Sequence, residues 1–155
     1  MDQTGTAEHA TGDLFSRAYA PMVRLAHLIT GSNAIAEELV QDAFVAVLPR
    51  ISQLTNPHAY LRMTVVNRCR SWGRRQRLEQ RQASPADESF VDDVGHAELV
   101  DALAGLPTRQ RAAVVLRYYE DLSEAEIADA LGCRPGTVKS LLSRGLASLR
   151  EVVER

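Results

Sequence analysis

The fold is decided near the C-terminal end of the chain, by residues 121–144, DLSEAEIADALGCRPGTVKSLLSR. Ser123 followed by Glu126 is a capping-box pattern, so a helix is predicted to begin at Ser123. Gly132 stands where a left-handed residue would end that helix. Pro135 suits the first turn of a second helix, because its missing N–H is not needed there. Two helices joined by so tight a turn predict a helix-turn-helix.

The second helix of this motif has an apolar face and a polar face. Val138, Leu142, Leu146 and Leu149 repeat at helical spacing and are predicted to point inward. The opposite face carries short polar and basic side chains, which is typical of a helix that enters the major groove of DNA. Lysine and arginine reach guanine acceptors there, and serine can contact either kind of base pair. The predicted DNA contacts are Arg134, Thr137, Lys139, Ser140, Ser143 and Arg144.

Length and composition place the chain among ordinary globular proteins. It has 155 residues, enough for one domain or two small ones, with 45% hydrophobic and 25% charged residues. No apolar run is long enough for a transmembrane helix, so no membrane insertion is expected. The two cysteines, Cys69 and Cys133, are far apart and predict free thiols in a reducing cytoplasm. Neither a metal nor a cofactor is expected, because no Cys-x-x-Cys pair or phosphate-binding glycine loop is present.

Charge is divided unevenly along the chain, although the net charge is only −2. Residues 62–81 hold seven arginines and a single acid, a composition suited to following phosphates. Residues 83–101 hold six acids and no lysine or arginine. The low apolar content, the Ser84-Pro85 pair and Gly95 are typical of a flexible linker, placed here at 79–95.

Helical periodicity extends over the rest of the sequence, and no strand pattern occurs. Pro21 is expected to kink or split the first of these helices. The prediction is an all-α protein of two small helical domains joined by a flexible acidic linker. The helices are expected at residues 14–30, 34–51, 58–75, 97–106 and 109–119, and the domains at 13–78 and 96–155, after a disordered tail at 1–12.

An ordered series of short motifs resembles the compact, two-domain bacterial sigma factors of the extracytoplasmic-function (ECF) group. The N-terminal half carries AEELVQDAF at 36–44, PHAYLR at 57–62, VVN at 65–67 and Arg74-Arg75. The C-terminal half carries LAGLP at 103–107, RQR at 109–111, VLRY at 115–118, EIA at 126–128 and GTVKS at 136–140. Each motif alone is weak, but the whole series spans residues 14–150.

The resemblance implies an alternative sigma factor, which binds RNA polymerase core and directs initiation at particular promoters. The helix at 34–51 would dock on the clamp helices of the largest catalytic subunit, through Glu38, Gln41, Asp42, Phe44 and Arg50. The following loop and helix would open the minus-ten element and hold a flipped base. Contacts there would come from Asn56, Arg62, Asn67, Arg70, Arg74 and Arg75. Trp72 could stack on a base, but its place in the apolar stripe favours a core role.

The second domain would read the minus-thirty-five element as duplex and contact the flap of the second large subunit. Leu141 departs from the family, in which many members have arginine, and is expected to contact a thymine methyl or a protein surface. Gly145 lies inside the same helix and should weaken it by roughly 1 kcal/mol relative to alanine. Many members are held inactive by an anti-sigma protein, a further expected partner.

Two other classes of function remain open from the sequence. A stand-alone helix-turn-helix regulator would leave residues 65–67 and the arginine cluster unexplained. An interaction protein that binds polymerase without reading DNA is mildly favoured by Leu141. An enzyme is the least expected class, because the histidines are scattered singly and no catalytic grouping is present.

Overall fold

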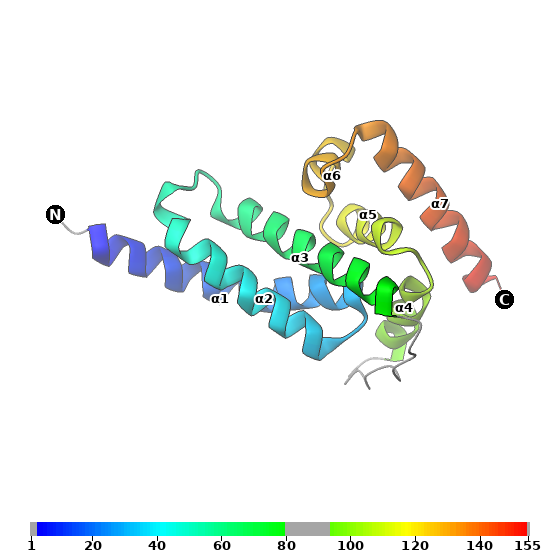
Figure 1. The fold of residues 1–155 in the computed structure, drawn as a ribbon, viewed down its shortest axis with the longest axis horizontal. Helices are drawn as coiled ribbons and strands as arrows, with labels where there is room; N and C mark the ends of the chain where they lie inside the picture. Colours follow the sequence, from blue (N-terminus) through cyan, green and yellow to red (C-terminus); the bar gives the residue numbers. More distant parts are fainter. Residues whose placement is uncertain (1–2, 80–93, 155) are drawn as a thin grey trace.

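The computed structural model describes residues 3–79 and 94–154, and every secondary-structure element within these stretches is a helix (Figure 1). This confirms the predicted all-α class. The elements are α1 (Gln3–Thr30), α2 (Asn33–Val47), the 3-10 helix η1 (Leu48–Gln53), α3 (Pro57–Glu79), α4 (Val94–Ala104), α5 (Thr108–Tyr118), α6 (Glu124–Leu131) and α7 (Pro135–Val153).

Helices α1, α2 and α3 form the N-terminal half, and α2 runs in the direction opposite to α1 and α3 (Figure 1). Gly31 adopts a positive φ of 78°, which turns the chain between α1 and α2. The Ser32 side chain then accepts a hydrogen bond from the Ile35 N–H and caps α2. The core between the helices is aliphatic, with Leu25 of α1, Val40 of α2 and residues of α3 fully buried.

The helices differ from the prediction in several places, and α3 runs to Glu79 where its end was predicted at residue 75. Residues 3–12 are helical and continue α1, where the sequence predicted a disordered tail, because no residue before Pro21 prevents helical hydrogen bonding. Pro21 lies inside α1, where it cannot donate a backbone hydrogen bond. Packing of its buried neighbours Ala18 and Met22 compensates for that loss, so the helix continues. The helix predicted to run to residue 51 changes to 3-10 geometry at Leu48, next to Pro49, which cannot donate to residue 45.

The second half is made of α4 to α7. Helix α5 packs against α7 on one side and against α1 and α3 on the other (Figure 1). Helices α6 and α7 form the helix-turn-helix and lie at the outer side of α5. The two halves therefore share a continuous buried core rather than meeting only through the chain that joins them. Glu79 ends α3 and residues 94–95 begin α4, so the rest of the predicted linker lies outside the described residues.

Candidate nucleic-acid interface

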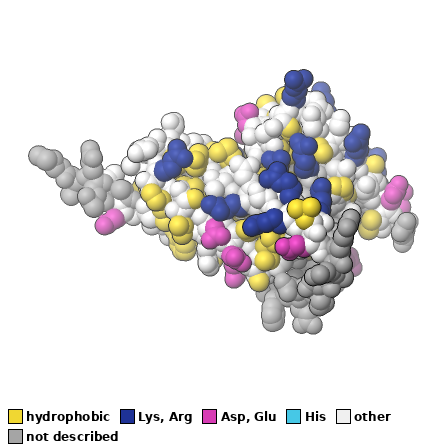
Figure 2. Space-filling model, viewed as in Figure 1, with side chains coloured by type: hydrophobic (Ala, Val, Ile, Leu, Met, Phe, Trp, Pro, Cys, Tyr) yellow, Lys and Arg dark blue, Asp and Glu magenta, His cyan; other side chains and the backbone are white. Residues whose placement is uncertain are grey.

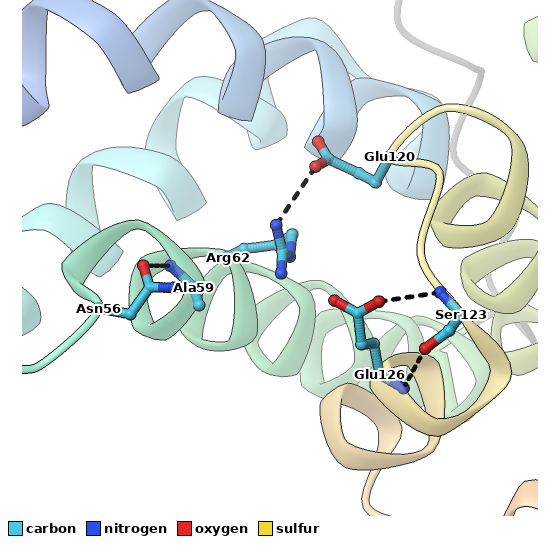
Figure 3. Close-up of polar contacts among 6 residues, drawn as sticks. All are labelled: Asn56, Ala59, Arg62, Glu120, Ser123 and Glu126. Atoms are coloured by element: carbon cyan, nitrogen blue, oxygen red, sulfur yellow. Dashed lines mark hydrogen bonds and ion pairs between the residues drawn. The ribbon is translucent and has the colours of Figure 1, made fainter.

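Helix α3 is fixed at its start by a side-chain cap. The Oδ1 atom of Asn56 accepts a hydrogen bond from the Ala59 N–H at 3.1 Å, and Pro57 occupies the first helical position (Figure 3). Asn56 was predicted as a promoter contact, and in this structure its side chain is exposed and acts as a helix cap. The cap fixes the residue at which α3 begins.

The predicted DNA-contacting arginines of α3 differ in exposure, and Arg74 also donates to the hydroxyl of Ser71 at 3.1 Å. Arg74 and Arg75 are exposed, as is Asn67, so these predicted contacts are accessible. Figure 2 shows Lys and Arg side chains gathered on one face, over α3 and the adjoining helix-turn-helix half. Arg62 and Arg70 are half-buried, because both lie against the second half of the protein.

Arg62 lies between two carboxylates that come from the second half (Figure 3). Its Nη1 atom is 3.6 Å from Oε2 of Glu120, and the two side chains are only 16% and 13% exposed. Glu126 lies on the other side of Arg62 in the same view. Hydrogen bonds from Ser123 and, to a smaller extent, the charge of Arg62 lower the pKa of Glu126.

Arg70 donates from Nη1 to the carbonyl oxygen of Leu131 at 2.7 Å. Leu131 is the last residue of α6, where free carbonyl groups give the helix a partial negative charge. Burial, followed by the charges of Arg109 and Arg74, lowers the pKa of the Arg70 guanidinium. The cation is thus held by a helix terminus instead of a counter-ion.

The helix-turn-helix has the capping predicted from its sequence. Ser123 Oγ accepts from the Glu126 N–H, and the Ser123 N–H donates to Glu126 Oε1, both at 3.1 Å (Figure 3). Gly132 ends α6 in the left-handed conformation, with φ 64°. Pro135 begins α7, and the predicted motif is confirmed from Ser123 through Pro135.

The polar face of α7 is open to solvent. Lys139 is 70% exposed at its side chain and lies 4.0 Å from Oε2 of Glu124. Ser143 and Arg144 are exposed, and so is Arg134 at the start of the helix. Ser140 is exposed and donates to the Gly136 carbonyl, whereas Thr137 is half-buried. The predicted duplex contacts thus lie on one helix, and the described residues leave most of them uncovered.

Leu141 and Gly145 have packing roles in α7. Leu141 is half-buried and packs against the hydrophobic core, so part of its side chain stabilises the motif. At Gly145 an added Cβ would lie 2.8 Å from Cγ2 of Val114 on α5. The absence of a side chain at Gly145 therefore lets α5 and α7 pack closely, which the helix-propensity argument did not foresee.

The outer face of α2 presents the predicted acids. Glu38, Gln41 and Asp42 are exposed, and Gln41 Nε2 donates to the Tyr19 hydroxyl at 3.3 Å. Phe44, predicted in the same docking surface, is only 3% exposed, so that assignment is corrected. Its ring lies in the core edge-on to Phe15, with centroids 5.3 Å apart.

Arg50, the last residue predicted for this surface, lies in the middle of η1. Its guanidinium donates to the Tyr60 hydroxyl at 2.6 Å and lies 5.1 Å from the centre of that ring. The structure thus places Arg50 beside the start of α3 rather than with the acids of α2.

Comparisons with known proteins match both halves. The family model described as Sigma-70 region 2 matches residues 14–79, and that described as Sigma-70, region 4 matches residues 96–149. The RNA polymerase sigma-E factor of Streptomyces avermitilis is 36% identical over 141 residues, which cover 86% of this chain and 79% of that protein. The ECF RNA polymerase sigma factor SigM of Mycobacterium tuberculosis is 30% identical, covering 95% and 82%. The chain belongs to the ECF sigma factor family.

This ECF sigma factor also shares its fold with a solved relative. The sigma factor RpoE of Bartonella quintana, crystallised with the anti-sigma factor NepR, superposes with a TM-score of 0.74 at 24% identity. The superposition covers 92% of this chain and 96% of that one. As a member of its family, the chain is an alternative sigma factor that binds RNA polymerase core and promoter DNA and directs transcription initiation. The region 2 match accounts for the half that a stand-alone regulator left unexplained.

Two residues that organise the ECF sigma factor were missed in the sequence. Arg111 donates to the carbonyls of Leu103, Ala104 and Leu106 at the end of α4, and to that of Ile29 at the end of α1. Gly73 lies where an added Cβ would be 2.7 Å from Thr108 of α5. The motif RQR at 109–111 was a usable signal for Arg111, but Gly73 had none, because its neighbour is 35 positions away.

One cavity joins the predicted minus-ten residues to the helix-turn-helix. It has a volume of about 380 Å³ and is lined by Asn56, Tyr60 and Arg62 from the start of α3 and by Glu126 and Asp129 from α6. Among residues 3–79 and 94–154, no group of three or more metal-binding side chains occurs. Within the same stretches, no helix is long and apolar enough to cross a membrane.

Proposed function

We propose that this sigma factor divides its work between the two halves, with residues 13–78 acting on polymerase and the minus-ten element and residues 96–155 on the minus-thirty-five element. The segment 79–95 would serve as the linker. The observation that carries the proposal is the pairing, in one molecule, of an arginine-rich helix with a helix-turn-helix whose polar face is open. The polymerase performs the chemistry, and the sigma factor itself has no catalytic role.

The acidic face of α2 is the proposed docking surface for the clamp helices of the largest polymerase subunit. Glu38, Gln41 and Asp42 are exposed together on it, and clustered carboxylates complement a basic partner and speed its association. Arg50 is proposed to extend this contact from η1. The hydrogen bond to the Tyr19 hydroxyl holds the Gln41 side chain in place on this surface.

Helix α3 is proposed to hold the separated minus-ten strand. Arg74 and Arg75 are free to neutralise phosphates, and the exposed amide of Asn67 can pair with a base edge. Arg62, Arg70 and Asn56 would join them at the start and middle of the helix. The cavity beside Asn56 is an opening into which an unstacked base could enter.

Helix α7 is proposed to read the minus-thirty-five duplex. Lys139 and Arg144 would contact guanines or phosphates, Ser140 and Ser143 base edges, and Arg134 and Thr137 the backbone. The same half would contact the flap of the second large subunit. Because residue 141 is leucine, the recognition helix presents one cation fewer than relatives with arginine there.

An anti-sigma protein is a further proposed partner. RpoE of Bartonella quintana, which shares this fold, was crystallised with the anti-sigma factor NepR. A protein of that kind would act in the cytoplasm, where the polymerase and promoters are, and would cover the docking or DNA-binding faces.

Run-off transcription with bacterial core polymerase and a library of promoter fragments tests the proposal. Asn67→Ala is expected to reduce strand opening, and Lys139→Ala to weaken binding of the minus-thirty-five duplex by about 1–3 kcal/mol per specific base contact. Arg150→Ala, an exposed change outside the proposed contact face, is the control. Core binding without initiation at any fragment would instead support an interaction protein.

A further inference from the structure

A second cavity lies where the C-terminal part of α3 meets the end of α4 and the start of α5. It has a volume of about 600 Å³ and is separate from the cavity at the start of α3. The side chains that line it include Trp72, Gln76 and Arg77 from α3 and Thr108 and Arg111 from α5. The cavity therefore lies between the two halves of the molecule.

The wall of this cavity is positively charged. The described residues that line it include Arg77 and Arg111 but neither aspartate nor glutamate. The two guanidiniums are close enough to repel each other, because burial and then the charge of Arg77 lower the pKa of Arg111. Two like charges that share a cavity attract an anion, since its charge cancels the repulsion between them.

Arg111 is fixed in place and contributes charge to the cavity. Its guanidinium already donates to carbonyl oxygens at the end of α1 and at and after the end of α4, so little of its donor capacity remains. These acceptors are neutral, and within residues 3–79 and 94–154 the Arg111 side chain forms no ion pair. A half-buried charge without an acidic partner is costly, so an anion placed beside it is favoured.

Arg77 supplies the available charged donor. Its side chain is exposed, and it forms neither a hydrogen bond nor an ion pair with any residue that the structure describes. Arginine presents its N–H groups in a fixed fork that matches the oxygen atoms of a phosphate group. Arg77 can therefore donate to an anion in the cavity without giving up an existing contact.

Neutral side chains complete the donor set of the cavity. The Thr108 hydroxyl oxygen lies beside Gly73, where an added Cβ would be only 2.7 Å from it. The absence of a side chain at Gly73 thus keeps space next to this hydroxyl. The amide of Gln76 is a further donor, and Trp72 adds a flat apolar surface to the same wall. Cationic and neutral donors around one space are suited to the several oxygen atoms of a phosphate group.

We propose that this cavity binds a small anion that carries phosphate groups, with Arg77 and Thr108 as donors and Arg111 as a fixed second charge. The bound anion bridges α3 and α5 and stabilises their packing. The inference goes beyond the proposed function, because binding requires neither polymerase nor promoter DNA. Free pyrophosphate and the phosphates of a nucleotide offer this chemistry equally, but only a nucleotide has a base that can stack on Trp72.

Isothermal titration calorimetry of the full chain with sodium pyrophosphate measures binding, with the ionic strength held constant by sodium chloride so that screening stays equal. Saturable heat is expected, with a saturable change in the fluorescence of Trp72, the single tryptophan. Arg77→Gln should weaken binding at least about tenfold, because a hydrogen bond from a charged donor is lost. Arg150→Gln, the same change at an exposed site on α7, is the matched control and should bind like the natural protein.

Thr108→Val is a second variant, which replaces the hydroxyl with a methyl group of similar size and leaves every charge in place. It should weaken pyrophosphate binding roughly two- to tenfold, less than Arg77→Gln does, because the hydrogen bond that it removes comes from a neutral donor. Circular dichroism verifies that each variant is folded.

The same calorimetric titration with ATP, in the absence of divalent cations, distinguishes the two sources of phosphate. Binding at least about tenfold tighter than that of pyrophosphate would identify a nucleotide, because stacking of its base adds to the phosphate contacts. Binding no tighter than that of pyrophosphate would identify an inorganic anion. Either result supports the site, provided that Arg77→Gln weakens the binding.

Three results would overturn the proposal. The first is the absence of both saturable heat and a fluorescence change with pyrophosphate and with ATP. The second is binding that Arg77→Gln leaves unchanged, and the third is an equal loss of affinity in Arg150→Gln, which would show a diffuse effect of charge. Run-off transcription judges the proposed function separately, because none of the substituted residues is assigned to polymerase or promoter.

Discussion

At the scale of single residues, the two thiols lie in contrasting surroundings. Cys69 is fully buried in α3, and burial raises its pKa from 9.0 to about 12, whereas Cys133 is half-buried after α6. Because the thiolate is the reactive form, Cys69 should resist alkylation at neutral pH until the protein unfolds. Mass spectrometry after treatment with N-ethylmaleimide should find one modified site in native protein, at Cys133. Equal modification of both sites would contradict the burial of Cys69.

The Ser123 cap is a second feature of residue scale. Ser123→Ala removes the acceptor for the Glu126 N–H and should lower the free energy of unfolding by about 1 kcal/mol. Urea denaturation followed by circular dichroism measures it. Ser143→Ala, an exposed change within α7, is the control and should have almost no effect. An equal loss in the two variants would show that the cap does not stabilise α6.

Glu126 should make stability depend on pH. Its pKa in the folded protein is lowered by the Ser123 hydrogen bonds first and by Arg62 as a smaller cause. A lowered folded pKa means that the ionised group stabilises the fold above its unfolded pKa, and that this contribution is lost as pH falls through the folded value. The difference in stability between the natural protein and Glu126→Gln should therefore shrink as pH falls from neutral to below the ordinary carboxyl range. A difference independent of pH would contradict the assignment.

At the scale of elements, the approach of α5 to α7 governs the helix-turn-helix. Gly145→Ala would gain about 1 kcal/mol of helix propensity, but the Cβ meets the rigid Val114 side chain at 2.8 Å, and overpacking costs about 1–3 kcal/mol. We expect a net loss of about 1 kcal/mol in thermal or urea denaturation. The double variant Gly145→Ala with Val114→Ala should lose less stability than the sum of the losses in the two single variants, because the smaller side chain at residue 114 leaves room for the added Cβ. A stabilised Gly145→Ala would show that the helices separate without cost.

At the scale of the whole molecule, Arg111 links the two halves. Its guanidinium donates hydrogen bonds to four carbonyl oxygens at and after the end of α4 and at the end of α1. Arg111→Ala should therefore lower the free energy of unfolding by about 3 kcal/mol, as expected for a half-buried charged donor. Fluorescence of Trp72, the single tryptophan, reports on α3, and circular dichroism reports on all helices. The two urea transitions should coincide in the natural protein and separate in Arg111→Ala. Arg109→Ala, exposed on the same helix, should keep them coincident.

Features that depend on a few consecutive residues could be predicted from the sequence. The Ser123 capping box, the left-handed Gly132 and the start of α7 at Pro135 all occur as expected, because each is decided by hydrogen bonds within one helical turn. The same local rules predicted that Pro21 would kink or split its helix, and the split is wrong, since α1 continues through Pro21 with buried neighbours on both sides. Phe44 lies on the apolar stripe of α2 that the helical spacing predicts, and its place in the docking surface, which only the resemblance implied, is wrong because the side chain is buried.

The sequence by itself determined an all-helical chain, the helix-turn-helix, the basic helix and membership of the ECF sigma factor family, because these depend on local spacing and on ordered motifs. Only the tertiary structure decided which cations are free. Arg62 and Arg74 are alike in the sequence, yet one is enclosed by Glu120 and the other faces solvent. Residue 120 lies 58 positions from Arg62, and such a pair forms only when packing brings α5 against α3.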